Sequence, residues 1–488
     1  MSDPLLPCDP SPTLLRENLP TWIDPLDALE GLRGQRHVVL LLSGPEGHPG
    51  ARFSILAADP FCVAALRGQE ARFTWAPGAG RPEERRRFED GFEFLRAIAP
   101  AGHLRPAPGL PFAGGAIGYL GYGLRRSTER LPALPPDPLA SPEAWFGLYD
   151  RAVVFDHAER RISVVSIGLS RGASRGGGRE ESGRLAELRS LLEAGERRRA
   201  RPAAKWERPP GRALLRTARP EYLRLVRRAL AYIAAGDIYQ VNLSHRIESP
   251  FDGDPVDLFR ALAEMSPAPF AAYLDAGEFR VLSASPERFV RARGDRATSS
   301  PIKGTRPRGR TKVEDARLAR DLVVSSKDRA ENIMIADLVR NDLGRVCVRG
   351  SVRVLKLCGL ESFATVHHLV STIEGRLRPD RDRIDLLRAL FPGGSMTGAP
   401  KIRAMEVIGE LEGEERGIYA GSIGYLSCDG GLDFNIAIRT IVCAGGRAHL
   451  RVGGAIVADS DPEAEFQETM DKARALLEVL GADFRRRG

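Results

Sequence analysis

Turn-forming residues punctuate this sequence along its whole length. It contains 51 glycines and 35 prolines among 488 residues, and the apolar runs between them are short. This pattern favours many turns and short strands over a bundle of long helices. Hydrophobic residues make up 43% and charged residues 28% of the chain. Such ordinary globular usage excludes a fibrous protein, a coiled coil and wholesale disorder.

One stretch in the middle of the chain differs from its surroundings. Residues 169–212 contain the glycine-rich tract 171–179, then a charged segment that predicts a short helix over about 183–198, and then prolines that end regular structure. We therefore predict an N-terminal region of mixed strand and turn at 1–168, a linker at 169–212 and a second region at 213–488.

The second region mixes helices and strands. Apolar spacing predicts helices over 220–235, over 313–343 with a break near Ser325, and over 462–480. Short apolar runs predict later strands at 423–426, 432–442 and 449–457.

Charge and cysteine usage restrict the partners and the compartment. The net charge is +8, but the basic runs lack interleaved aromatic residues, so a surface that stacks single-stranded nucleic acid is not expected. The six cysteines form no CxxC pair and no cluster with zinc spacing, which is typical of a reducing compartment. We find neither a signal peptide nor an apolar run of membrane-spanning length. The sequence thus predicts a soluble cytoplasmic protein without nucleic-acid or membrane partners.

Two pairs of acidic residues share one spacing. Asp328 and Glu331 are three residues apart, as are Glu465 and Glu468, and this spacing puts both members of a pair on one helix face. Two such faces brought together would offer carboxylate oxygens to Mg²⁺, which proteins hold through one or two carboxylates and retained waters. On spacing alone, a solvated helix face is the more common meaning of such charges.

Lys303 lies in a stiff segment between Pro301 and Pro307, with Arg306 and Arg308 close by. If it is desolvated near other cations, its pKa falls, and it can act as a nucleophile or base. The alternative is a cation-rich surface loop.

Glu287 follows an apolar strand and precedes Arg288. It is a candidate general acid if it is buried, and a partner in an ion pair if it is not. His367 and His368 are neighbours in a predicted strand. Because neighbours in a strand face opposite ways, at most one of these rings faces a site.

Taken together, five segments resemble one enzyme family. In order, they are 236–244, 301–309, 330–342, 393–401 and 453–469. The chain is similar to the chorismate-utilising enzymes that include anthranilate synthase, isochorismate synthase and component I of aminodeoxychorismate synthase. The resemblance is strong over 217–480 and looser over 30–165. It implies an α+β fold of two large, mainly antiparallel sheets packed face to face, with helices outside and a site for Mg²⁺ and chorismate between the sheets.

The resemblance also implies roles for individual residues. Glu331 and Glu468 match direct metal ligands, and Asp328 and Glu465 match positions that act through metal-bound water. Positions that match contacts to the substrate are Arg439, Tyr419, His368, Thr305, Gln240, the backbone amides of Gly453, Gly454 and Ala455, and Ser395, which stands where anthranilate synthases carry threonine.

Three positions bear on which member of the family the chain resembles most. Relatives that add water carry lysine where this chain has Gln240, and glutamine cannot act as a base. Anthranilate synthases carry alanine where this chain has Lys303, a form that resembles aminodeoxychorismate synthases. In that chemistry Glu287 is the general acid, Lys303 forms a covalent adduct with chorismate, and ammonia yields 4-amino-4-deoxychorismate on the route to 4-aminobenzoate and folate.

Several alternatives and two further expectations complete this interpretation. Anthranilate synthase is the second candidate activity. A basic RNA-binding protein would explain the charge but not the four acids. An inactive relative would show substituted acids, whereas every acid of the pattern is present. The chain has no recognisable glutaminase segment, so we expect ammonia to come from a separate glutamine amidotransferase subunit. Ser43, at the end of an apolar run, resembles a position by which relatives hold a tryptophan molecule.

Overall fold

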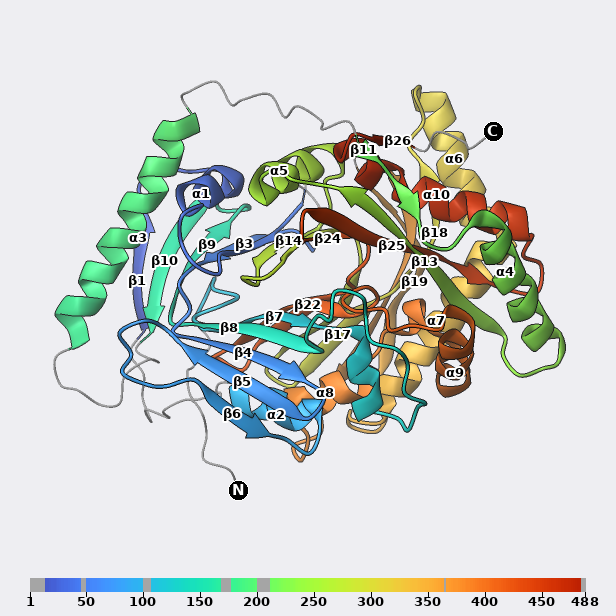
Figure 1. The fold of residues 1–488 in the computed structure, drawn as a ribbon, viewed down its shortest axis with the longest axis horizontal. Coiled ribbons are helices and arrows are strands. Elements are labelled where there is room, and N and C mark those ends of the chain that lie inside the picture. Colours follow the sequence, from blue (N-terminus) through green and yellow to red (C-terminus); the bar gives the residue numbers. More distant parts are fainter. Residues whose placement is uncertain are drawn as a thin grey trace.

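Two large antiparallel sheets form the centre of the protein. The computed structural model describes residues 14–44, 50–99, 107–167, 177–199, 211–363 and 366–483. Within them, two 12-stranded sheets pack face to face with helices outside (Figure 1). This is the fold class that the resemblance implied. None of the described helices is long and apolar enough to cross a membrane.

Sheet one runs in the spatial order β1 (Leu14–Leu19), β10 (Arg161–Ile167), β9 (Arg151–Asp156), β3 (Phe53–Ala57), β2 (Val39–Leu42), β14 (Phe270–Asp275), β15 (Arg280–Ser285), β24 (Thr440–Ala444), β25 (Arg447–Ile456), β13 (Gln240–Pro250) and β12 (Leu214–Leu215), with β21 (Gly398–Ala399) paired to β13. Sheet two runs β18 (Ile302–Pro307), β20 (Val366–Arg376), β17 (Arg296–Ser300), β16 (Arg288–Arg293), β23 (Leu432–Asn435), β22 (Ser422–Ser427), β7 (Gly115–Leu120), β8 (Ala144–Tyr149), β4 (Cys62–Arg67), β5 (Glu70–Trp75) and β6 (Glu84–Arg87), with β19 (Arg353–Ser362) paired to β20.

Both parts of the sequence build both sheets. β2 pairs with β14 in sheet one, and β7 pairs with β22 in sheet two. The helix expected over 183–198 is α3 (Gly177–Arg199), which begins inside the glycine tract and packs against α1 (Pro25–Gly31). Much of the predicted linker, at 169–176 and 200–210, lies outside the described residues.

Helices cover the outer faces of the sheets. Sheet one carries α1, α3, α5 (Pro255–Met265) and α10 (Pro462–Val479), and α4 (Arg219–Ala234) and α9 (Lys401–Glu412) pack on β13. Sheet two carries α2 (Gly91–Ile98), α6 (Lys312–Val324), α7 (Ser326–Gly344) and α8 (Arg383–Leu390). Two 3-10 turns, η1 (Tyr122–Ser127) and η2 (Gly394–Met396), and a parallel pair, β11 (Gly211–Arg212) with β26 (Ala482–Asp483), complete the elements.

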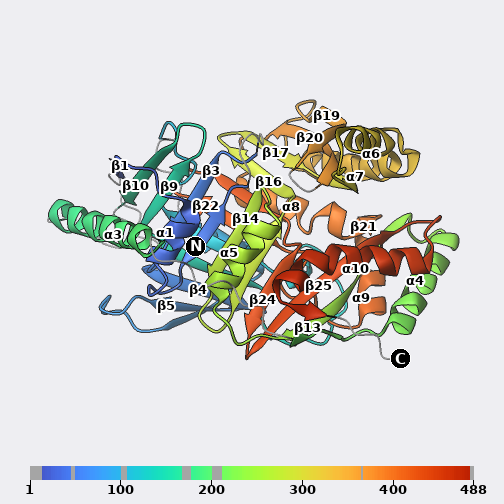
Figure 2. The same ribbon diagram turned by 90° about the horizontal axis from the view of Figure 1, so that it is seen from above.

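A third apolar layer fills the space between the sheets. Ile55, Val165 and Leu274 from sheet one meet Ile117 and Tyr425 from sheet two. Because the strands are covered on both faces, their apolar runs are nearly continuous instead of alternating. The site elements gather at one end of this sandwich, where Figure 2 shows α7 and α10 lying far from α3.

The sequence predicted one helix over 313–343 with a break near Ser325, and this break is confirmed. Ser325 ends α6 and caps α7, with its hydroxyl accepting from the Asp328 N–H at 3.3 Å. The single strand predicted over 432–442 was wrong. It is two strands, because β23 belongs to sheet two and β24 to sheet one.

Candidate active site

Two neighbouring crossings between the sheets define the candidate site. β15 in sheet one leads through Glu287 into β16 in sheet two, and β23 leads through 436–439 into β24. The Ile436 N–H donates to the Glu287 carbonyl oxygen at 3.0 Å, and the Ala284 N–H donates to the Arg439 carbonyl oxygen at 3.0 Å. The two crossings therefore run side by side and place Glu287 and Arg439 between the sheets.

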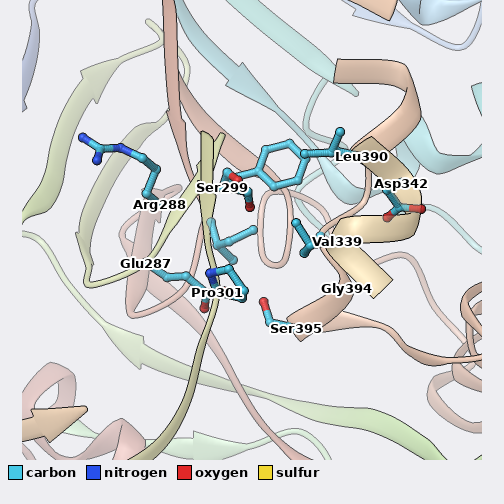
Figure 3. A pocket seen from close by; sticks show the side chains of 12 residues that line it. Glu287, Arg288, Ser299, Pro301, Val339, Asp342, Leu390, Gly394 and Ser395 are labelled. Atoms are coloured by element: carbon cyan, nitrogen blue, oxygen red, sulfur yellow. Dashed lines mark hydrogen bonds between the residues drawn. The ribbon is translucent and has the colours of Figure 1, made fainter. Parts of the chain in front are cut away.

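The Glu287 side chain is buried, with 5% of the residue exposed. Burial raises the pKa of its carboxyl to about 7, although a hydrogen bond from the Ser395 hydroxyl and the charge of Lys303 both favour the ionised form. Figure 3 shows Glu287 and Ser395 at the same edge of a small cavity. A carboxyl group with this pKa keeps a protonated fraction near neutral pH, as a general acid requires.

β18 approaches α7 very closely beside Lys303. The register of β18 with β20 shifts between Ile302 and Thr305, and Gly304 in this interval has a φ of 82°. A Cβ on Gly304 would come 2.9 Å from the Asp328 Cβ. Glycine therefore meets both demands here, a left-handed backbone and a close approach.

Burial lowers the pKa of the Lys303 amine, and the charge of Lys472 acts in the same direction. The carboxylates of Glu331, Glu287 and Glu468 oppose this shift. The lysine thus lies among the acids that the sequence had singled out.

The two arginines next to Lys303 do not supply the neighbouring positive charge. The sequence placed Arg306 and Arg308 close to Lys303 and expected them to lower its pKa. Instead, Arg306 pairs with Asp328 and Arg308 pairs with Asp315, each at 2.8 Å. The cation that acts on Lys303 is Lys472 from α10.

The two predicted acid pairs come from α7 and α10 and interact across the site. Burial raises the pKa of Glu331, and the charges of Asp328 and Glu468 add to this effect. Burial also acts to raise the pKa of Glu468, but Lys472, with its Nζ 2.7 Å from the carboxylate, outweighs it and lowers the pKa.

Glu465 is the most enclosed of the four acids, with 4% of the residue exposed. Burial raises its pKa, while the Ser460 hydroxyl donates to Oε1 at 2.6 Å. Its other oxygen, Oε2, is buried without a hydrogen-bond partner in the described part of the chain. Gly454 lies against this oxygen, because a Cβ there would come 3.1 Å from it.

These four acids are the residues that could hold a divalent cation. They offer only carboxylate oxygens, which suit a hard cation such as Mg²⁺, and the orphaned oxygen of Glu465 lacks a donor or cation that would offset its burial. Among the described residues, no group of three or more acidic, histidine or cysteine side chains is already gathered at metal-binding distance.

Arg439 and the neutral histidine His368 interact with each other. Burial lowers the pKa of Arg439, and no acidic side chain in the described ranges forms an ion pair with it. Burial, helped by the charge of Arg439, lowers the pKa of His368 to about 3. His367 faces the other way and contacts Asp315 at 2.9 Å. A half-buried arginine without an ion-pair partner among the described residues is suited to an anionic ligand such as a carboxylate.

The glycine pair of β25 lies next to a buried tyrosine. A Cβ on Gly453 would come 2.9 Å from the Tyr419 Oη, whose pKa burial raises to about 12. β24 pairs with β25 only as far as Leu450. β24 therefore leaves the edge of β25 open at Gly453, Gly454 and Ala455, the positions where the resemblance predicts backbone contacts to an anion.

Gln240 and Thr305 close the predicted set. Gln240 opens β13 and is fully buried, yet neither amide atom has a partner among the described residues. The Thr305 hydroxyl and the His368 Nδ1 are hydrogen bonded at 2.8 Å, which orients the imidazole ring.

Comparison with known proteins agrees with this geometry. Residues 47–478 match the family described as chorismate binding enzyme. The chain belongs to the chorismate-binding enzyme family. It is 42% identical to aminodeoxychorismate synthase component 1 of Salmonella typhimurium, over 91% of this chain and 92% of that one. It is also 42% identical to anthranilate synthase component 1 of Thermus thermophilus, over 93% and 95%. The crystal structure of anthranilate synthase component I from Streptococcus pneumoniae aligns with a TM-score of 0.74 and 34% identity, covering 88% of this chain and 93% of that one.

Two lysines in this chorismate-binding enzyme were missed by the sequence reasoning. Lys472 also donates to the Gly453 carbonyl oxygen at 3.0 Å, and the charge of Lys327 acts on Glu331, Glu465 and Glu468. The spacing of Lys472, four residues after Glu468 on one helix, was the signal that could have revealed it.

Ser43 lies apart from these residues, directly after β2. Its hydroxyl donates to the Phe53 carbonyl oxygen at 2.6 Å, and its N–H donates to the Ser54 hydroxyl at 2.9 Å. We also predict that the loop 44–52 folds over such a tryptophan molecule. Its residues 45–49 lie outside the described residues.

Proposed function

We propose that this protein is component I of aminodeoxychorismate synthase, which aminates chorismate at carbon 4. The observation that carries the proposal is Lys303, a partly buried amine with a lowered pKa beside the proton donor Glu287. In the chemistry that the resemblance implies, alanine at this position leaves ammonia to attack directly, whereas lysine supplies a nucleophile of its own.

The first half of the reaction forms the adduct. The neutral Lys303 amine attacks carbon 2 of chorismate, a C–N bond forms and the ring double bonds shift. The C–O bond at carbon 4 breaks, and Glu287 gives its proton to the departing hydroxyl, which leaves as water, since hydroxide is a poor leaving group. The proton lost from the lysine nitrogen balances the one that Glu287 has given.

The second half releases the lysine. Ammonia adds at carbon 4, the double bonds shift back, and the bond between Lys303 and carbon 2 breaks. The lysine nitrogen takes up the proton that ammonia loses, so chorismate and ammonia become 4-amino-4-deoxychorismate and water.

The remaining residues bind and orient the substrate. Arg439, Tyr419 and the open edge of β25 hold its carboxylates, while Thr305 fixes the ring of the neutral His368 in place. Glu331 and Glu468, with Asp328 and Glu465 acting through water, would hold Mg²⁺. When bound, this ion supplies positive charge against a substrate carboxylate.

A separate glutamine amidotransferase is the proposed source of ammonia. Relatives carry the name component 1, which supports a second subunit. The second candidate activity is anthranilate synthesis, because the identity to an anthranilate synthase component equals that to an aminodeoxychorismate synthase component.

A product assay separates the two activities. The purified chain is incubated with chorismate, Mg²⁺ and an ammonium salt, and the products are resolved by chromatography. We expect 4-amino-4-deoxychorismate, with 4-aminobenzoate only after a lyase is added. Release of anthranilate and pyruvate would overturn the proposal. The variant Lys303→Ala tests the proposed nucleophile in the same assay. Its control is Lys356→Ala, which changes a lysine of β19 that pairs with Glu361.

A further inference from the structure

The segment 391–400 brings Ser395 to Glu287, and both its ends are attached to one ammonium group. The segment joins α8 to α9. The Lys401 Nζ donates to the Leu390 carbonyl oxygen at 3.1 Å, at the end of α8, and to the Asp342 carboxylate on α7 at 2.5 Å. Lys401 therefore closes the segment into a loop and fastens it to α7.

The backbone in the middle of this loop is closely packed. A Cβ on Gly393 would come 2.6 Å from the Ile436 side chain, and one on Gly394 would come 2.6 Å from the Leu338 side chain. Ile436 belongs to the crossing beside Glu287, and Leu338 belongs to α7. The backbone before Ser395 is thus packed between the crossing and the helix that carries Asp342.

One cavity connects these groups. It is lined on one side by Glu287 and Ser395 and on the other by Asp342, Val339 and Leu390. Figure 3 shows Glu287 and Ser395 near its lower edge and Asp342 on α7 at its right. We therefore expect a displacement of Asp342 or Lys401 to change the position of the Ser395 hydroxyl relative to Glu287.

The Asp342–Lys401 pair has no part in the chemistry described above, yet it is costly to keep. Its side chains are 7% and 13% exposed, and burying two charges is expensive unless the pair is well bonded. Both residues lie in segments that the sequence singled out, 330–342 and 393–401. The first of these segments supplies Glu331 to the proposed mechanism, and the second supplies Ser395 to the Glu287 carboxyl group.

We propose that Asp342 and Lys401 are positioning residues for the proton donor: their ion pair fixes the loop 391–400 so that the Ser395 hydroxyl meets the Glu287 carboxyl group. Neither residue touches substrate in this scheme. The inference rests on the proposed function only in taking Glu287 as the proton donor.

The charged groups around Glu287 allow the effect to be predicted. Lys303 faces it from β18, Asp342 lies across the cavity on α7, and the adjacent Arg288 is paired with Asp433 at 3.0 Å. The hydrogen bond from Ser395 favours the ionised carboxylate. If the loop moves, that bond is lost and Glu287 holds its proton to higher pH.

The test titrates Glu287 in the free enzyme by carbon-13 NMR of labelled glutamate, with the signal assigned by its loss in Glu287→Gln. Ser395→Ala should move the titration midpoint upward by about one pH unit, the worth of one hydrogen bond to a charged group. The double change Asp342→Leu with Lys401→Met, which removes both charges together, should give a similar upward shift. Adding Ser395→Ala to it should shift the midpoint no further.

Controls separate positioning from general damage. Asp27→Asn breaks another pair with a buried carboxylate, to Arg260 at 3.1 Å on the outer face of sheet one, and should leave the midpoint of Glu287 in place. If the double variant does not fold, Asp342→Glu keeps the charges but lengthens the pair by one methylene, and it too should shift the midpoint upward.

Two outcomes overturn the inference. In the first, Glu287 of a folded Asp342 variant has the same titration midpoint as in the wild type. In the second, the midpoint shift of the double variant adds fully to the shift caused by Ser395→Ala. Because no substrate is present, either result can be interpreted whichever product the enzyme forms. A wrong product in the chromatographic assay would reject the proposed function and leave this titration intact.

Discussion

Replacing Glu287 by glutamine should make the protein more stable at alkaline pH while it removes activity. The carboxyl group is buried, and burial raises its pKa from 4.5 to about 7. In the unfolded chain the same group ionises near its ordinary pKa. Folding at high pH therefore places a charge where the surroundings favour a neutral group, and glutamine has the same shape without that charge.

The sign and size follow from the two pKa values. Below pH 4.5 the carboxyl group is protonated in both states, so it costs the folded state nothing. As the pH rises towards 7, only the unfolded state loses the proton, and the free energy of unfolding falls. Well above pH 7, ionisation of Glu287 has lowered the free energy of unfolding by its full amount, about 3 kcal/mol. This value comes from a difference of about 2.5 pKa units between the two states, at 1.36 kcal/mol each.

The assay is urea unfolding of the wild type and Glu287→Gln at pH 4, 6 and 8. We expect the variant to gain about 3 kcal/mol over the wild type at pH 8, roughly half to two thirds of that at pH 6, and little at pH 4. Chorismate turnover should be lost at every pH. A stability difference that stays constant between pH 4 and pH 8 would refute the reasoning, because only a shifted ionisation depends on pH.

Four other predictions concern the proposed chemistry. Intact-mass measurement of the enzyme with chorismate and Mg²⁺ but no ammonia should show an added mass of chorismate less water, absent in Lys303→Ala, which should retain slow turnover and bind chorismate. Glu468→Gln should lower turnover on the order of 100-fold by weakening the metal site, and full wild-type activity after exhaustive chelation would exclude the metal. Glutamine alone should support no turnover until a glutamine amidotransferase subunit is added; activity of this chain with glutamine alone would contradict that dependence. Calorimetry with added tryptophan should show no free site near Ser43, or a rate assay should show that tryptophan leaves turnover unchanged, whereas competitive inhibition would favour anthranilate synthesis.

Local patterns in the sequence predicted the helices well but not the crossings between the sheets. The break at Ser325 is visible in the sequence because a serine there can cap a helix, and the structure has it. The division of 432–442 into two strands is not visible in the sequence, because Ile436 and its neighbours are as apolar as the strands around them. Only the pairing of β16 with β23 and of β15 with β24 decides that the chain changes sheet there.

The candidate site shows the same limit. Spacing of three residues correctly placed Asp328 with Glu331, and Glu465 with Glu468, on single helix faces. It could not show that α7 and α10 approach the same lysine, because that depends on which helices cover which end of the sheets. The positive charge beside Lys303 was sought in the adjacent arginines, yet Arg306 and Arg308 are neutralised by local acids. The sequence reasoning thus overestimated the effect of the neighbouring arginines on Lys303 and missed the effect of Lys472, which is distant in the sequence.

The paired shifts of Lys303 and Glu287 explain how both can work at one pH. Burial favours the neutral form of each, the amine of Lys303 and the carboxylic acid of Glu287, while their mutual attraction favours the ion pair. The neutral pair and the ion pair bind the same number of protons, but only the neutral pair contains a nucleophile and an acid. Glu331 and Glu468 add negative charge that stabilises the lysine ammonium. Whatever positive charge offsets these two carboxylates, Lys472 in this structure or a cation at the proposed metal site, therefore shifts the balance towards the reactive pair.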